Sequence, residues 1–270
     1  MVMCGARLTL SLGPRRRKSG GFEGPEGLGM QVATLHSESN RCPDGCERCD
    51  ARAISICSVL PHLELHRLAD CATVKGYSAG EMVVREGDPA DQVFNITDGM
   101  VMLFSLLSDG RRQVLGFLFK GDFLGLTGGP EHRFGVQALT TVRVCRFPRA
   151  MFRRLLLETP QLEEELLSRA SDELISAHVH LTLLGRKSAL EKVASFLLYI
   201  ADREAKIGGA PNLAFLPMTR ADMADFLGLT METVSRVMSD LKRQRVIELL
   251  HHGGVRLLRR DMLTAQAEIV

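Results

Sequence analysis

The sequence contains no long hydrophobic run. Its longest apolar pieces, such as "VASFLLYIA" at residues 193–201, are short, whereas a membrane-spanning helix needs about 20 apolar residues. The N-terminal basic run, residues 15–18, follows an apolar piece, which is the reverse of the order in a secretory signal. We therefore expect a cytoplasmic protein that makes no contact with a membrane.

Signs of catalysis are also missing. The sequence shows no glycine-rich phosphate loop and no nucleophile paired with a recognisable base, so we expect that the protein is not an enzyme. Charge of either sign is not in excess, because 34 Lys and Arg face 32 Asp and Glu. A nucleic-acid partner must therefore be inferred from local patterns and not from net charge.

The cysteine count argues against a disulfide scaffold. Seven cysteines are an odd number, and a chain without an export signal stays in a reducing compartment. Four of the seven lie in "RCPDGCERCDARAISIC", residues 41–57. Cysteines clustered in this way indicate metal or redox chemistry.

The spacing of these cysteines allows more than one metal site. Cys46, Cys49 and Cys57 follow the pattern Cys-x2-Cys-x7-Cys, and thiolates suit both iron and zinc. Two cysteines separated by two residues can reach adjacent corners of an iron–sulfur cluster from one loop. Cys42 lies four residues before Cys46. The spacing alone therefore permits a single ion held by Cys42 together with these three cysteines, without the distant Cys145.

The rest of the chain changes its pattern twice. From about residue 60 to residue 148, short β-type runs are separated by Gly and Asp turns every 7 to 12 residues, which predicts an antiparallel β-roll. A long helix then begins near Pro160. Apolar residues recur along it at alternating steps of three and four, a coiled-coil seam that predicts self-association into a homodimer. The seam consists of Leu167, Ala170, Leu174, Ala177, Leu181 and Leu184.

The C-terminal stretch has the pattern of a winged helix-turn-helix. Thr219 and Asp222 are spaced as a capping box, Gly228 supplies the turn, and Thr230 caps a second helix. On that helix Glu232, Ser235 and Arg236 occupy the polar face. Arg can donate twice to guanine and Glu can accept from cytosine, so we expect this face to read double-stranded DNA.

These features predict an α+β chain with an N-terminal antiparallel β-roll (a double-stranded β-helix or jelly-roll) as sensor domain, a long dimerisation helix and a C-terminal winged helix-turn-helix. The expected divisions are a disordered tail (1–40), a cysteine-rich segment (41–60), the β-roll (61–150), the dimerisation helix (151–185) and the DNA-binding domain (186–270).

Together the two halves resemble the CRP/FNR superfamily of transcription regulators over residues 55–270. "LTMETVSRVM" matches the Glu-x-x-Ser-Arg signature of the FNR branch at Glu232, Ser235 and Arg236. The resemblance implies two-fold target sites of the TTGAT type and a contact with RNA polymerase. Cyclic-nucleotide readers of the superfamily carry a Glu where this chain has Leu126. Only Arg133 remains of the Arg-Ser pair that binds the phosphate, so we do not expect a cyclic nucleotide.

The same resemblance gives the cysteines a role. It implies an oxygen-labile [4Fe-4S] cluster on Cys46, Cys49, Cys57 and Cys145, with a longer last spacer typical of FnrN-like and FixK-like regulators. Loss of the cluster would then shift dimerisation and DNA binding. Two alternatives stay open: Cys42 as a substitute ligand, and a CRP-like regulator with structural zinc on the cysteines and a small-molecule effector in the β-roll.

Overall fold

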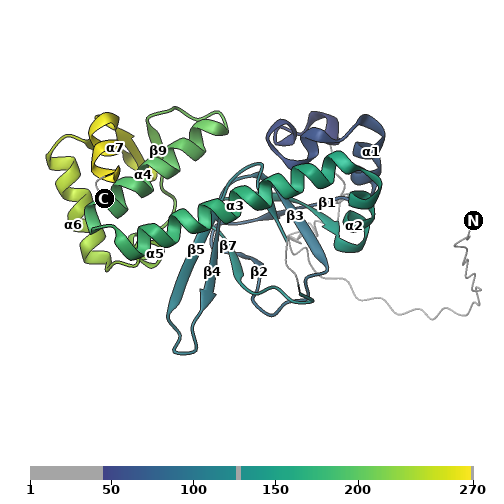
Figure 1. Ribbon diagram of the computed structural model, residues 1–270, viewed down its shortest axis with the longest axis horizontal. Helices are drawn as coiled ribbons and strands as arrows, with labels where there is room; N and C mark the ends of the chain where they lie inside the picture. The colour runs from purple at the N-terminus through teal and green to yellow at the C-terminus, as the bar shows by residue number, and fades with distance from the viewer. Residues whose placement is uncertain (1–44, 126–128, 269–270) are drawn as a thin grey trace, which may run out of the picture. The chain divides into compact units, whose positions relative to one another are not determined.

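The computed structural model describes residues 45–125 and 129–268 (Figure 1). The predicted tail, Cys42 and Leu126 lie outside the described residues. Three 3-10 turns and one helix precede the strands of the β-roll, and helices follow them. The last part of the described chain, residues 189–268, is called the DNA-binding half below, after the domain that the sequence predicts there. The predicted α+β fold is confirmed.

Two four-stranded antiparallel sheets form the β-roll, in the orders β1-β8-β3-β6 and β2-β7-β4-β5. Asp109 and Gly110 form the turn between β4 and β5, and Gly110 has a φ of 85°, a conformation that glycine adopts without strain. The strands are β1 (Thr73–Tyr77), β2 (Met82–Val84), β3 (Gln92–Asp98), β4 (Val101–Leu106), β5 (Arg112–Leu118), β6 (Phe123–Leu124), β7 (Gly135–Ala138) and β8 (Val142–Pro148).

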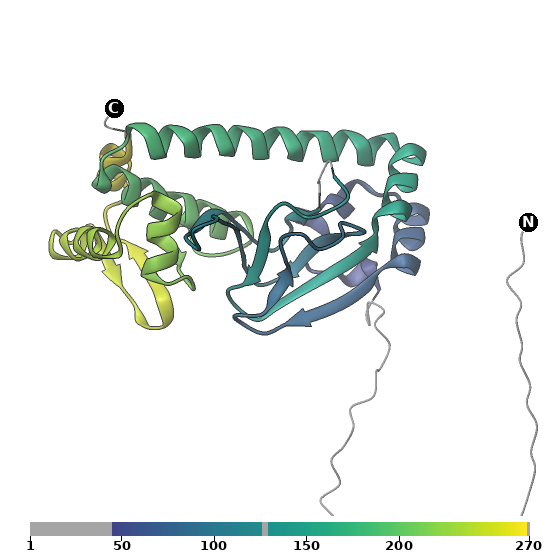
Figure 2. The ribbon, with the colours of Figure 1, turned by 90° about the horizontal axis from the view of Figure 1, so that it is seen from below.

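Helical elements lie on both sides of the strands in the sequence. Before them come three 3-10 turns and one helix: η1 (Cys46–Arg48), η2 (Arg52–Ile54), η3 (Ile56–Val59) and α1 (His62–Cys71). After them come α2 (Arg149–Glu158), α3 (Pro160–Arg186) and α4 (Ala189–Lys206). Figure 2 shows α3 as one uninterrupted helix that runs past the strands toward the DNA-binding half.

The segment 151–185, predicted as one dimerisation helix, spans most of α2 and nearly all of α3. The two helices are separated at Thr159, whose φ of −133° and ψ of 89° are not helical. Pro160 follows at the first position of α3. Proline lacks a backbone N–H and disfavours helical geometry in the residue before it, so the chain stops one helix and starts another here.

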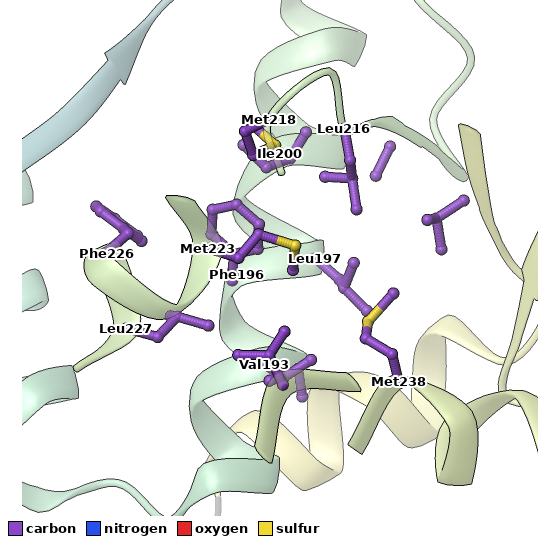
Figure 3. Close-up of a cluster of buried hydrophobic side chains, with 14 of the residues drawn as sticks. Val193, Phe196, Leu197, Ile200, Leu216, Met218, Met223, Phe226, Leu227 and Met238 are labelled. Carbon is purple, nitrogen blue, oxygen red and sulfur yellow. The ribbon is translucent and has the colours of Figure 1, made fainter. Parts of the chain in front are cut away.

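The DNA-binding half packs around α4. Figure 3 shows side chains of α4, including Val193, Phe196 and Leu197, meeting Met223 of α5 and Met238 of α6 in one apolar cluster. A three-stranded sheet of order β10-β11-β9 forms the wing. The elements are β9 (Leu213–Phe215), α5 (Arg220–Leu227), α6 (Met231–Arg243), β10 (Ile247–Leu249), η4 (His251–Gly253), β11 (Gly254–Leu257) and α7 (Arg260–Glu268).

Strand β9 and helix α7 were not predicted from the sequence. Strand β9 has three residues and pairs with β11. Three residues are too few for a hydrophobic pattern to be recognisable in the sequence. None of the helices in the described ranges is both long and apolar enough to span a bilayer.

Candidate metal centre and nucleic-acid interface

The cysteine-rich segment folds as three consecutive 3-10 turns. Ser55, which is fully buried, organises the second and third: its hydroxyl donates to the carbonyl of Arg52 at 3.2 Å and accepts from the backbone N–H of Cys57 at 3.3 Å. Such a local side-chain bond replaces a backbone bond and favours a tight turn over a regular helix. Cys57 is thereby fixed at the start of η3.

Cys57 and Cys145, remote in sequence, belong to the same buried apolar cluster. Their exposed fractions are 8% and 5%, and the half-buried Cys46 packs against this cluster. Cys145 reaches the cluster from β8, where it stands opposite Val74 of β1. Cys49 is half-buried and lies near enough to Cys57 to affect its ionisation. The fold therefore brings the four cysteines of the predicted set into one region.

Burial raises the pKa of the Cys57 thiol to about 11, a shift that Cys49 increases and the hydrogen bond from Ser55 opposes. The thiol is thus protonated at neutral pH in the metal-free chain, and a metal must displace that proton. Among the side chains that the structure describes, no three Cys, His, Asp or Glu are grouped tightly enough for one metal ion. Thiolates are the ligands that iron–sulfur clusters take, so the donor set fits such a cluster.

The helix-turn-helix has the caps that the sequence predicts. The Thr219 hydroxyl accepts from the N–H of Asp222, and the Asp222 carboxylate accepts from the N–H of Thr219 at 2.8 Å. Gly228 ends α5 with a φ of 59°, and the Thr230 hydroxyl accepts from the N–H of Thr233 at the start of α6. Because both caps satisfy backbone N–H groups, the helix starts are fixed locally.

Helix α6 divides into a buried face and an exposed one. Val234, Val237, Met238 and Leu241 are buried in the apolar cluster. On the other face, Glu232, Ser235 and Arg236 are exposed, as a DNA-reading face requires. Hydrogen bonds to the backbone N–H at the helix start and to Thr230 lower the pKa of Glu232. The carboxylate is therefore an acceptor at neutral pH, able to receive a bond from a base amino group.

Sequence reasoning missed an ionic contact between the β-roll and α5. The Arg112 guanidinium on β5 pairs with the Asp222 carboxylate and with Asp225, the latter at 3.1 Å. The Gln113 side chain donates to the carbonyl of Asp225 at 2.7 Å. The oxygen of Asp222 that faces Arg112 is not the one that caps α5. The Asp222 carboxylate thus joins α5, the first helix of the helix-turn-helix, to the β-roll.

Aromatic rings complete the same junction. Phe226 of α5 has its ring 5.2 Å from that of Phe117 on β5 and 5.5 Å from that of Phe196 on α4. His180 of α3 stacks on Phe226, with the two ring centroids 4.1 Å apart. Burial, followed by the nearby charge of Lys192, lowers the pKa of His180. The neutral imidazole is therefore the form that fits this stack.

Most of the predicted dimer seam is exposed in the single chain. The exposed fractions of Leu167, Leu174 and Leu181 are 68%, 58% and 64%. The exception is Leu184, which is half-buried against the cluster of the DNA-binding half. Exposed leucines in regular order along one helix are unusual for a surface that faces only water.

Two protein families match the chain, one in each half. Residues 74–159 match the family described as cyclic nucleotide-binding domain. Residues 191–266 match the family described as Crp-like helix-turn-helix domain.

Similar proteins cover both halves. The nitrogen fixation regulation protein FixK of Bradyrhizobium diazoefficiens is 42% identical over 218 residues, which are 80% of this chain and 92% of that protein. The transcriptional activator protein FnrL of Cereibacter sphaeroides is 39% identical over 223 residues, 80% of this chain and 88% of that one. The solved structure of FixK2 from Bradyrhizobium japonicum has a TM-score of 0.68 and 35% identity, and covers 74% of this chain and 98% of its own.

Proposed function

The chain belongs to the CRP/FNR family of DNA-binding transcription regulators, and we propose that it is an oxygen-responsive member controlled by a [4Fe-4S] cluster. Members of this family bind DNA as dimers, and the chain is an activator of the FixK/FNR type rather than an enzyme. We place its action in the cytoplasm.

The observation that carries the proposal is the meeting of thiols from two distant segments. Cys57 and Cys145 share one buried cluster, and Cys46 packs against it. Cys49 lies close enough to Cys57 to raise the pKa of its thiol. These four residues would hold the cluster. When bound, a [4Fe-4S] cluster supplies an oxygen-sensitive link between the N-terminal segment and β8.

The chain's own residues connect this segment to the dimer helix. Arg169 of α3 donates to the carbonyl of Ile54 in η2 and to the carbonyl of Gly121, each at 3.2 Å. Glu165, one turn earlier, accepts from the same guanidinium at 2.7 Å. A displacement of the cysteine segment would therefore remove the hydrogen bond between Arg169 and Ile54, two residues from Leu167 on α3. Such a change alters the balance between two states of the helix and hence of the dimer.

DNA binding is assigned to α6. We propose that Glu232, Ser235 and Arg236 read two-fold sites with TTGAT-type half-sites, as the signature of the FNR branch implies. The seam on α3 pairs two copies so that two α6 helices face successive major grooves. For activation, our candidate contact for RNA polymerase is the stretch "SDGRRQ", residues 108–113, of which 108–111 are exposed and 112 and 113 begin β5.

The decisive experiment is anaerobic purification, followed by a visible spectrum and analysis of iron, sulfide and zinc before and after air. A brown protein with about four irons per chain, which bleaches in air and loses its dimer, is the expected result. Cys145→Ala should abolish the colour, whereas Cys71→Ala, which changes a half-buried thiol of α1 outside the set, should keep it. A colourless protein with stoichiometric zinc would overturn the proposal.

A further inference from the structure

Strand β3 carries a buried amide on the face of its sheet that meets the cysteine segment. Side chains alternate along this strand, and Phe94 and Ile96 pack inside the β-roll. Val93, on the opposite face, belongs to the apolar cluster that contains Cys145. Asn95 follows Val93 by two residues and therefore lies on the same face. Its side chain is buried, with an exposed fraction of 2%.

Asn95 and Cys145 are direct partners across two strands. Strands β3 and β8 pair antiparallel with these two residues opposite each other. Opposite residues of an antiparallel pair share one face, with Cβ atoms about 4.5–5.5 Å apart. The same row across the sheet continues to Phe123 on β6 and to Val74 on β1. Both outer side chains are hydrocarbon, so the sulfur of Cys145 is the atom of this row that an amide N–H can bond.

The amide is a poor choice for the fold alone. Among the groups that the structure describes, Oδ1 of Asn95 meets no hydrogen-bond donor. A buried polar atom without a partner destabilises a protein, and Asn is also depleted in strands. A branched apolar residue would suit this face better. Such a group in a folded protein therefore calls for a functional explanation.

We propose that Asn95 is a positioning residue for the iron–sulfur cluster, and that its side-chain N–H donates to the sulfur of Cys145. The inference rests on the proposed function, because an iron-bound thiolate carries negative charge and accepts a hydrogen bond better than a neutral thiol does. Rotation of the amide about its last bond exchanges Nδ2 with Oδ1 and leaves the shape of the side chain unchanged.

This bond has two consequences for the iron–sulfur cluster. A partner of a metal ligand holds that ligand in orientation, so Asn95 fixes the one cysteine that the β-roll supplies. Hydrogen bonds to the sulfurs also help to set the potential of an iron–sulfur cluster. Since the N–H draws electron density from the sulfur, the cluster loses an electron less readily. Asn95 therefore slows the attack of oxygen.

The test compares wild type with Asn95→Val and Asn95→Thr, each purified anaerobically as the full-length protein. Valine and threonine have nearly the same shape and both favour strands, so the pair differs in a hydroxyl that can donate to sulfur. Bleaching of Asn95→Val in air should be about tenfold faster than that of wild type, and Asn95→Thr should lie between the two. The visible absorption of Asn95→Val should shift to longer wavelength, because the sulfur electrons lose the stabilisation given by the N–H.

Unfolding in urea of the full-length chains after removal of iron gives a readout that needs no cluster. Asn95→Val should unfold at a higher urea concentration than wild type, because the substitution removes the unpaired oxygen. One substitution would thus stabilise the chain and make the cluster more labile. A residue with a purely structural role does not give this combination.

Two sets of results would overturn the role of Asn95 while the cluster itself stands. In the first, Asn95→Val bleaches at the wild-type rate, or the valine and threonine variants bleach equally fast. In the second, iron-free Asn95→Val is less stable than wild type or does not fold, which would make Asn95 a structural residue. A wild-type protein that contains no iron after anaerobic purification would instead refute the proposed function, and this inference with it.

Discussion

Removing the Arg112 side chain should weaken the attachment of the DNA-binding half to the β-roll. The side chains of Arg112, Asp222 and Asp225 are 27%, 9% and 34% exposed. The ion pairs that Arg112 makes with the two carboxylates are therefore intermediate in burial. A surface ion pair is worth about 0–1 kcal/mol, and the disruption of a buried pair costs about 3–5 kcal/mol. A charged hydrogen bond in such a setting contributes about 1.5–3 kcal/mol.

We expect Arg112→Met to lower the free energy of unfolding by about 2 kcal/mol. Methionine keeps the apolar stem that packs at the junction, so the loss reports mainly on the guanidinium. Part of that loss comes from Phe104, whose ring centroid lies 5.7 Å from the guanidinium carbon; such a contact adds about 0.5–1 kcal/mol at a partly exposed site.

The assay is urea unfolding followed by far-UV circular dichroism, since the chain has no tryptophan. Arg111→Met is the matched control, because the Arg111 side chain is 77% exposed and pairs with the nearby Asp109. Its effect should stay within about 0.5 kcal/mol. A cycle that combines Arg112→Met with Asp225→Asn should show a coupling of about 1 kcal/mol or more. If Arg112→Met is as mild as the control and the cycle is additive, the ionic contact does not join the two halves.

Three further predictions concern the turn beside the cysteine segment, the ring stack and the reading face. Gly121 has a φ of +93°, and an added Cβ would lie 2.8 Å from the carbonyl oxygen of Ile54. Gly121→Ala should therefore lower the free energy of unfolding in urea more than Gly110→Ala does, because Gly110 has a φ of +85° but open space around it. Equal effects of the two substitutions would contradict the close contact. The lowered pKa of His180 means that the unfolded chain binds more protons below about pH 6.5. The stability that His180 contributes should thus be present above that pH and fall as the pH drops toward the folded-state pKa. His180→Phe should reduce the pH dependence of the free energy of unfolding, measured by urea unfolding at several pH values. An unchanged pH dependence would exclude His180 as its source. Arg236→Ala should cost about 1–3 kcal/mol of DNA binding and relax the preference at one base pair, as measured on a panel of single-base variants; uniform weakening on all sequences would make Arg236 a phosphate contact instead.

Local signals in the sequence were sufficient for the helix-turn-helix. The capping pair Thr219 and Asp222 and the turn at Gly228 involve residues that are neighbours along the chain, so no distant contact is needed to predict them. The same holds for the end of α2, where Pro160 acts on the residue before it. The predicted start of the long helix near Pro160 agrees with α3, and the domain division 151–185 includes most of α2 before it.

Tertiary structure decided which distant residues meet. The sequence by itself determined the number and type of the thiols, the polar face of α6 and the apolar seam of α3, because each depends on composition or on spacing along one element. It left open whether Cys145 joins Cys57, and it gave no sign that Arg112 pairs with Asp222. The first contact depends on how β8 packs against the cysteine segment, and the second on how β5 packs against α5. A pattern along the sequence contains no information on which elements pack together.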